Sequence, residues 1–163
     1  MRENHRTGSI PTILNTLIQY LHENGSQPAV WNADQQNVTS SLTVYHPEVE
    51  EPPSDDPVDV QAWLEGRIQD QMEKRYDAIL DVGGGESAFS RLIRQTDLAR
   101  TLRRRGIRIV LANVLGPDQA DVDYLAGFVE NDLFVPDDVV IVYNGAALVH
   151  GLGHWPSAPK VNG

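Results

Sequence analysis

The chain has 163 residues, and its 13 Lys and Arg against 23 Asp and Glu give a formal net charge of −10. This length suits one domain with a sizeable core, and the acidic balance argues against nucleic-acid binding over the whole surface. The sequence holds no cysteine, which excludes disulfides, thiolate metal sites and cysteine nucleophiles. No apolar run approaches the ~20 residues that span a bilayer, and the charged start lacks the apolar stretch of a secretion signal. We therefore expect a soluble, cytoplasmic protein without membrane contact.

A helix over residues 11–24 is the first element that the pattern predicts. Its apolar residues recur at i, i+3, i+4 and i+7 and form one face: Leu14, Leu17, Ile18 and Leu21. Gly25 follows where a left-handed helix end is expected. Residues 28–32 then predict a short strand that is apolar on both faces, as in a buried parallel sheet.

An acidic, proline-rich loop follows at residues 46–59. It holds four prolines and six acids, a composition typical of a solvated loop. We expect Asp59, at its end, to cap a helix that runs to about Arg75. The apolar face of this helix is predicted to comprise Val60, Trp63, Leu64, Ile68 and Met72.

The rest of the chain continues to alternate strands with helices. The predicted strands are 76–82, 107–114 and 139–143, and the predicted helices are 87–94, 97–105 and 118–130. This order predicts an α/β fold with a mainly parallel sheet flanked by helices, in which ligands bind outside the carboxyl ends of the strands. Those ends carry glycines and short polar side chains: Asn32, Asp34, Asp81, residues 83–85, Asn113 and Asn144.

The segment from Asp81 to Ser87 (Asp-Val-Gly-Gly-Gly-Glu-Ser) has three interpretations. In the first, the acid at the strand end holds a water of a Mg²⁺ shell and the glycines let the backbone approach a phosphate. In the second, the segment resembles the first motif of S-adenosylmethionine-dependent methyltransferases, although strand 107–114 ends without the acid that would bind the ribose. In the third, it is a tight turn that uses glycine for a positive φ.

Four predicted elements follow one another in a recognisable order: the helix at Thr12 and the strands that end at Asn32, Asp81 and Asn144. In order and spacing they resemble the ParA/MinD family of deviant-Walker P-loop ATPases. That family carries Asp-x-Asp-Pro-Gln after its second strand, and here Asn32, Asp34 and Gln36 stand at the two acids and the glutamine. Residues 80–144 are most similar to the partition and mobilisation proteins of bacterial plasmids.

This resemblance implies a P-loop NTPase-like domain over residues 1–150, a flexible tail at 151–163, and ATP with Mg²⁺ as ligands. Asp34 would be the catalytic residue that positions the attacking water, and Asp81 would hold Mg²⁺ through a water. The other cofactor-binding residues that the resemblance implies are Thr12, Gly83 and Gly84 near the phosphates and Asn144 near the base.

The P loop departs from the family pattern. Ile10 stands where the family has the lysine that reaches the phosphates, and Pro11 stands where it has a Mg²⁺-binding hydroxyl. The family's first strand is also lacking. We therefore expect weak or absent ATP hydrolysis. A sheet without that strand has open edges, which predicts self-association or a protein partner.

A basic cluster is predicted on the helix at 97–105, formed by Arg100, Arg103, Arg104 and Arg105. One interpretation is electrostatic, salt-sensitive contact with non-specific DNA, which surface arginines make in relatives of ParA. The other is a solvated helix face, on which cations near the carboxyl end are favourable.

Overall fold

The structure is a computed structural model, and it describes residues 10–34, 42–82, 88–115 and 134–143. The chain divides into two compact units, Met1–Asp97 and Leu98–Gly163. Each unit combines helices with a short parallel sheet, so the predicted α/β class is confirmed. A P-loop NTPase-like fold stays a prediction, as do the helix at 118–130 and the tail at 151–163, which lie outside the described residues.

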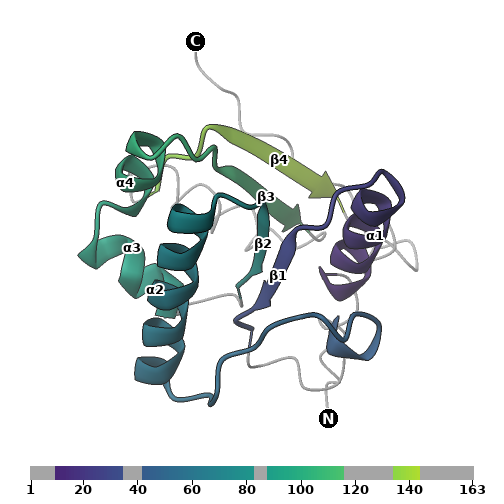
Figure 1. The fold of residues 1–163 in the computed structure, drawn as a ribbon, viewed down its shortest axis with the longest axis horizontal. Coiled ribbons are helices and arrows are strands. Elements are labelled where there is room, and N and C mark those ends of the chain that lie inside the picture. Colours follow the sequence, from purple (N-terminus) through teal and green to yellow (C-terminus); the bar gives the residue numbers. More distant parts are fainter. Residues whose placement is uncertain (1–9, 35–41, 83–87, 116–133, 144–163) are drawn as a thin grey trace, which may run out of the picture. The chain divides into compact units, whose positions relative to one another are not determined.

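The first unit places a two-stranded parallel sheet between two helices (Figure 1). Its elements are α1 (Ile10–Glu23), β1 (Ala29–Asn32), the 3₁₀ helix η2 (Leu42–Val44), α2 (Pro57–Lys74), β2 (Ala78–Asp81) and α3 (Ala88–Gln95). Strands β1 and β2 pair in register from Ala29 opposite Ala78 to Asn32 opposite Asp81. The register brings the carboxyl ends of both strands level with each other.

Helix α1 covers one face of this sheet. Ile18 of α1 is completely buried, and it packs in a core with Val30 of β1, Leu42 and Val49. The helix ends as predicted, because Gly25 adopts a φ of +80°. Leu17 belongs to the predicted apolar face but stays 40 % exposed.

Helix α2 begins three residues earlier than the sequence predicted, and the expected cap at Asp59 is wrong. Asp56 is the cap, because its carboxylate accepts a hydrogen bond of 2.8 Å from the backbone N–H of Val58. Pro57 suits the first helical position, where its missing N–H costs nothing. Asp59 instead lies in the first turn and accepts a 2.6 Å hydrogen bond from the Ser54 hydroxyl.

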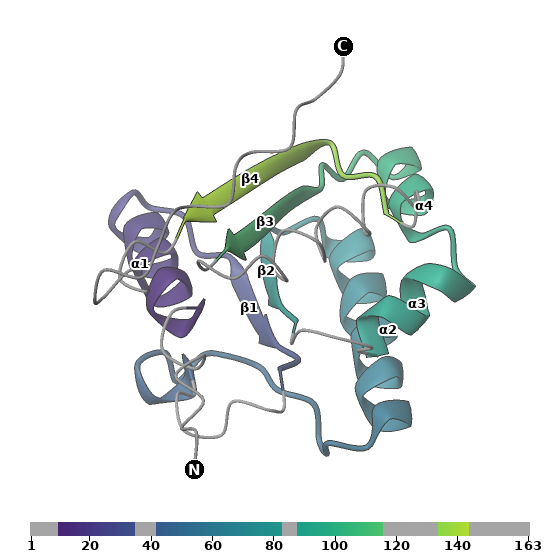
Figure 2. The same ribbon diagram turned by 180° about the vertical axis from the view of Figure 1, so that it is seen from behind.

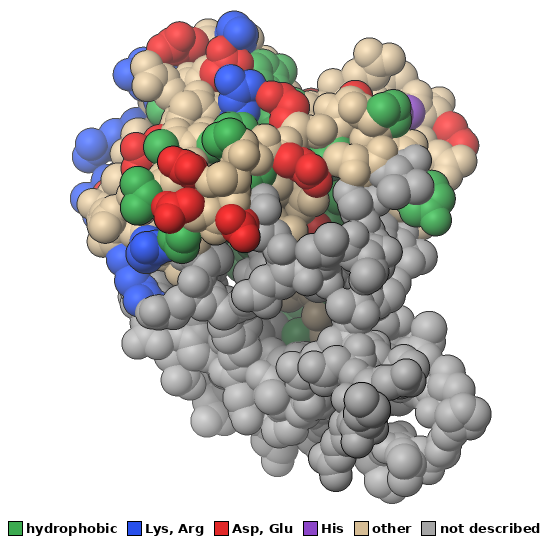
Figure 3. Space-filling model, turned by 90° about the horizontal axis from the view of Figure 1, so that it is seen from below, with side chains coloured by type: hydrophobic (Ala, Val, Ile, Leu, Met, Phe, Trp, Pro, Cys, Tyr) green, Lys and Arg blue, Asp and Glu red, His purple; other side chains and the backbone are tan. Residues whose placement is uncertain are grey.

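The acidic loop before α2 is solvated over most of its length, as predicted, but it is anchored to the sheet. Val49 is buried, and Glu50 forms an isolated parallel bridge with Trp31 of β1. The remaining acids near α2 are exposed: Glu51, Asp55, Asp56 and Asp59. Figure 3 looks at the molecule from the side where α2 begins and shows acidic side chains on the described surface.

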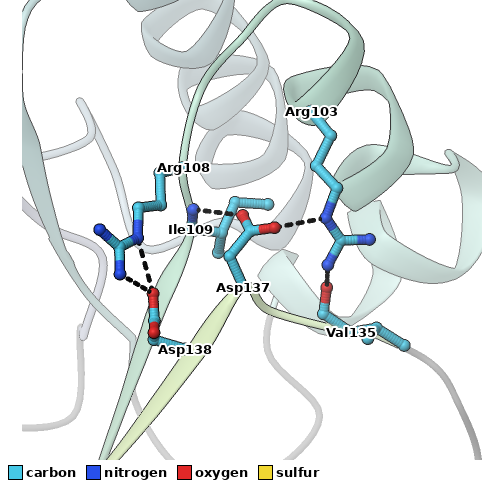
Figure 4. A network of polar contacts seen from close by, with 6 residues as sticks. All are labelled: Arg103, Arg108, Ile109, Val135, Asp137 and Asp138. Atoms are coloured by element: carbon cyan, nitrogen blue, oxygen red, sulfur yellow. Dashed lines mark hydrogen bonds and ion pairs between the residues drawn. The ribbon is translucent and has the colours of Figure 1, made fainter.

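The second unit contains α4 (Leu98–Arg104), β3 (Val110–Leu115) and β4 (Asp138–Tyr143), and its two strands are parallel. Strand β3 begins three residues later than predicted, and the hydrogen bonds of Ile109, one of which Figure 4 shows, give the reason. The Ile109 carbonyl accepts from the backbone N–H groups of Asp137 and Asp138, while the Ile109 N–H donates to the Asp137 carboxylate at 2.8 Å. The segment before Val110 is therefore held by a loop and a side chain rather than by a strand ladder.

Candidate functional site

Two of the predicted site residues, Asp34 and Asp81, come together at the carboxyl ends of β1 and β2. Asp81 ends β2 opposite Asn32, and its carbonyl accepts a 2.9 Å hydrogen bond from the backbone N–H of Ala33. Asp34 follows directly, so that two carboxylates stand at one edge of a parallel sheet. We call Asp34 and Asp81 the carboxylate pair.

The electrostatics of the carboxylate pair are unusual for surface acids. Burial and, second, the nearby negative charge of Asp34 together raise the pKa of the Asp81 carboxyl to about 6. Both causes penalise the ionised form of Asp81. A cation at this edge would remove part of that penalty, because it would offset both negative charges.

Asn32 connects the carboxylate pair to the chain that precedes α2. Its side chain is buried, with 8 % of the residue exposed. Its Nδ2 donates to Oε1 of Glu51 at 2.9 Å, and its Oδ1 accepts from the backbone N–H of Asp34 at 3.1 Å. The amide thus bonds on one side to the loop and on the other side to the backbone of Asp34.

Helix α1 begins at the same edge of the sheet. Figures 1 and 2 show α1 running opposite in direction to β1, so that its first turn, with Thr12, lies at the end where β1 stops. This turn contains no acidic residue. The free N–H groups and the dipole of a helix start favour anions such as phosphate.

The donor set limits which metal could bind. Among the described residues, no group of three or more His, Asp or Glu side chains could hold a metal ion. Mg²⁺ commonly takes one or two protein carboxylates and completes its shell with water and substrate phosphates. The carboxylate pair fits Mg²⁺ brought by a phosphate ligand, and it does not form a metal cage made of protein alone.

The other predicted site residues are placed only in part. Gly83, Gly84 and Asn144 lie outside the described residues, so their roles stay predictions. The arginines of α4 belong to the second unit. There Arg103 donates through Nε to Asp137 at 2.7 Å and also donates to the Val135 carbonyl (Figure 4). At least one member of the basic cluster is therefore engaged within its own unit, and DNA contact stays a prediction.

The sequence analysis missed a cleft of about 770 Å³ at the amino end of β1, opposite to the carboxylate pair. Its charged side chains are paired: Arg67 contacts Glu50 at 2.6 Å, and Lys74 contacts Asp70 at 2.7 Å. Tyr76 donates to Asp70 at 2.9 Å, and burial followed by this hydrogen bond raises the pKa of Tyr76 to about 12. These residues follow no sequence motif, because they come together only through the path of α2.

Comparisons with protein-family models, with curated proteins and with solved structures find no match to this chain. The resemblance to the ParA/MinD family therefore rests on the sequence motifs alone. In the described part of the chain, no helix combines the length and apolar character needed to cross a membrane.

Proposed function

We propose that the chain is a nucleotide-binding protein of the ParA/MinD type, acting in plasmid partition or mobilisation, with weak or absent ATP hydrolysis. The observation that carries this proposal is the carboxylate pair at the sheet edge where α1 begins. Two acids and a helix start at one edge supply what a Mg²⁺-bound phosphate chain needs.

The proposed roles follow from this placement and from the family resemblance. Asp81 would hold the Mg²⁺ shell through a water, and Asp34 would position the water that attacks the terminal phosphate. Bound Mg²⁺ supplies charge compensation for phosphoryl transfer. Thr12, Gly83 and Gly84 would lie near the phosphates, and Asn144 near the base.

Weak turnover is proposed because the start of α1 lacks a cation. Ile10 and Pro11 are the first two residues of this helix. At the positions where the family has its phosphate-binding lysine and its hydroxyl, this chain has an aliphatic side chain and a ring without an N–H. Phosphoryl transfer depends on positive charge around the phosphates, so loss of the lysine removes a principal contribution.

The test is an NMR titration of the full chain with Mg·ATP at pH 7.5, which lies above the raised pKa of Asp81. We expect shifts at Ala33 and Asp81 with a dissociation constant of about 1 mM, or about −4 kcal/mol. The double variant D34N D81N should lose this response, whereas D55N, which changes an exposed acid of the loop, should keep it.

Three results would count against the proposal. Micromolar affinity would contradict a weakened phosphate site. The absence of any response at Ala33 and Asp81 up to ~10 mM, well above the expected constant, would contradict nucleotide binding. Saturable binding of S-adenosylmethionine in the same experiment would favour the methyltransferase interpretation of the segment from Asp81 to Ser87.

A further inference from the structure

We propose that Asn32 is a positioning residue for the carboxylate pair and that Glu51 acts through it. The bridging amide of Asn32 fixes the backbone at Asp34, so that the Asp34 carboxylate stays beside Asp81. The importance of this position for catalysis rests on the proposed function, but the positioning itself does not.

The side-chain amide of Asn32 accepts one hydrogen bond and donates another. Oδ1 accepts from the Asp34 N–H at 3.1 Å, which closes a local side-chain turn at the end of β1. Nδ2 donates to Glu51 at 2.9 Å, and this second bond fixes the orientation of the amide. The Asn32 backbone is held too, because its N–H donates to the Glu50 carbonyl at 2.9 Å.

An aspartate at position 32 could not make the same set of contacts. An ionised carboxylate only accepts hydrogen bonds, so it would face Glu51 without a proton to share. It would also add a third negative charge beside the carboxylate pair at a buried position. Asparagine at this position is thus matched to a glutamate at position 51.

Burial supports a fixed geometry. With 8 % of the residue exposed, Asn32 has little access to water as an alternative partner. Loss of Glu51 would leave a buried Nδ2 unsatisfied and free the amide to rotate. Rotation would break the bond to the Asp34 N–H, and the backbone at Asp34 would lose this constraint.

The experiment measures the pKa of Asp81 by ¹³C NMR titration in the absence of nucleotide, so it reads positioning and not nucleotide binding. D34N removes the neighbouring charge and defines the largest fall in the Asp81 pKa that loss of Asp34 can cause. We expect N32A to give most of this fall. In the D34N background, N32A should cause no further change, because its effect runs through Asp34.

Glu51 provides a matched pair of variants at an exposed position, where folding is not at risk. E51Q keeps an oxygen that can accept from Asn32, and we expect the Asp81 pKa to match that of the unmodified chain. E51A removes the acceptor, and we expect the pKa to fall in the same direction as in N32A. Equal pKa values in E51A and E51Q would overturn the role of Glu51.

An additive cycle, in which N32A lowers the Asp81 pKa equally with and without Asp34, would overturn the proposal. It would show that Asn32 acts by shielding Asp81 from water. If the cycle behaves as expected but Mg·ATP does not bind, the positioning stands and the proposed function fails.

Discussion

Asp81 should destabilise the folded protein at neutral pH, and its replacement by asparagine tests this directly. The pKa of Asp81 is raised from 3.8 to about 6, first by burial and second by Asp34, so the folded state resists ionisation. A shift of about two units corresponds to about 3 kcal/mol at pH 7. Because the side chain keeps some exposure and a neighbour can relax, we expect D81N to be more stable by about 1–3 kcal/mol.

The pH dependence gives the sharper test. Well below pH 3.8, Asp81 is protonated in both the folded and the unfolded state, so it costs no stability. As pH rises from 4 to about 6, the unfolded chain ionises freely and the folded chain does not, and stability is lost over that window. The stability advantage of D81N should therefore be absent well below pH 3.8, grow as the pH rises to about 6–7 and then stay constant.

Urea unfolding of both proteins at a series of pH values measures this difference, because acids shared by the two proteins cancel. If Mg²⁺ binds the carboxylate pair, adding it at pH 7.5 should stabilise the unmodified chain alone. The difference in free energy of unfolding between the two proteins should then become smaller. An advantage of D81N that does not change with pH would refute the reasoning. A D81N protein that is less stable at pH 7 would refute it as well, since Asp81 would then gain more from its contacts than it loses by burial.

Four further predictions concern the framework of the two units. L64A, at a completely buried position of α2, should cost about 2–5 kcal/mol in urea unfolding, whereas V58A, at a 71 % exposed position, should change stability by less than about 0.5 kcal/mol. The backbone N–H of Ile109 and then Arg103 hold the pKa of Asp137 below its usual range. The ionised Asp137 therefore stabilises the fold at neutral pH, and this contribution is lost as the pH falls and the carboxylate is protonated. D137A should speed amide hydrogen exchange at Ile109 at pH 7 but not in strong acid. Duplex DNA of any sequence should bind only at low salt, since Arg103 already pairs with Asp137; retained binding at ~0.15 M salt would contradict this. The predicted self-association should weaken in V139T I141T, because both half-exposed side chains lie on one face of β4, and an unchanged sedimentation profile would exclude that face.

The carboxylate pair could be predicted because it depends on short-range patterns. An apolar strand that ends in Asn-Ala-Asp and another that ends in Asp both show where the sheet stops. Parallel pairing then places both ends at one edge, and the register of Asn32 opposite Asp81 confirms this. Strand order along the chain was enough to find these residues.

The helix start at Pro57 could also have been found from the sequence. Asp56 followed by proline is a stronger start signal than Asp59, because proline suits the first helical position and the preceding acid can accept a backbone N–H. The prediction was wrong because it assigned all four prolines of residues 46–59 to the loop. Pro57 belongs to the helix and not to the loop.

Contacts between distant segments could not be predicted in the same way. Arg103 and Asp137 lie 34 residues apart, and nothing in either segment selects the other. Their contact requires β3 and β4 to be paired first, since only then does the turn before β4 reach the end of α4. The bond between Asn32 and Glu51 depends likewise on the bridge between Trp31 and Glu50, which sets the path of the loop.

Because the contacts of Asn32 depend on the path of a distant loop, no sequence motif predicted the hydrogen bonds that position the carboxylate pair. Motifs identify groups by their chemical type, whereas the orientation of Asp34 is set by Asn32, whose amide is itself held by a glutamate 19 residues away. An amide at position 32 suits the neighbouring Glu51: a buried donor is needed where a carboxylate approaches, and a further carboxylate there would add charge to an edge that already raises the pKa of Asp81.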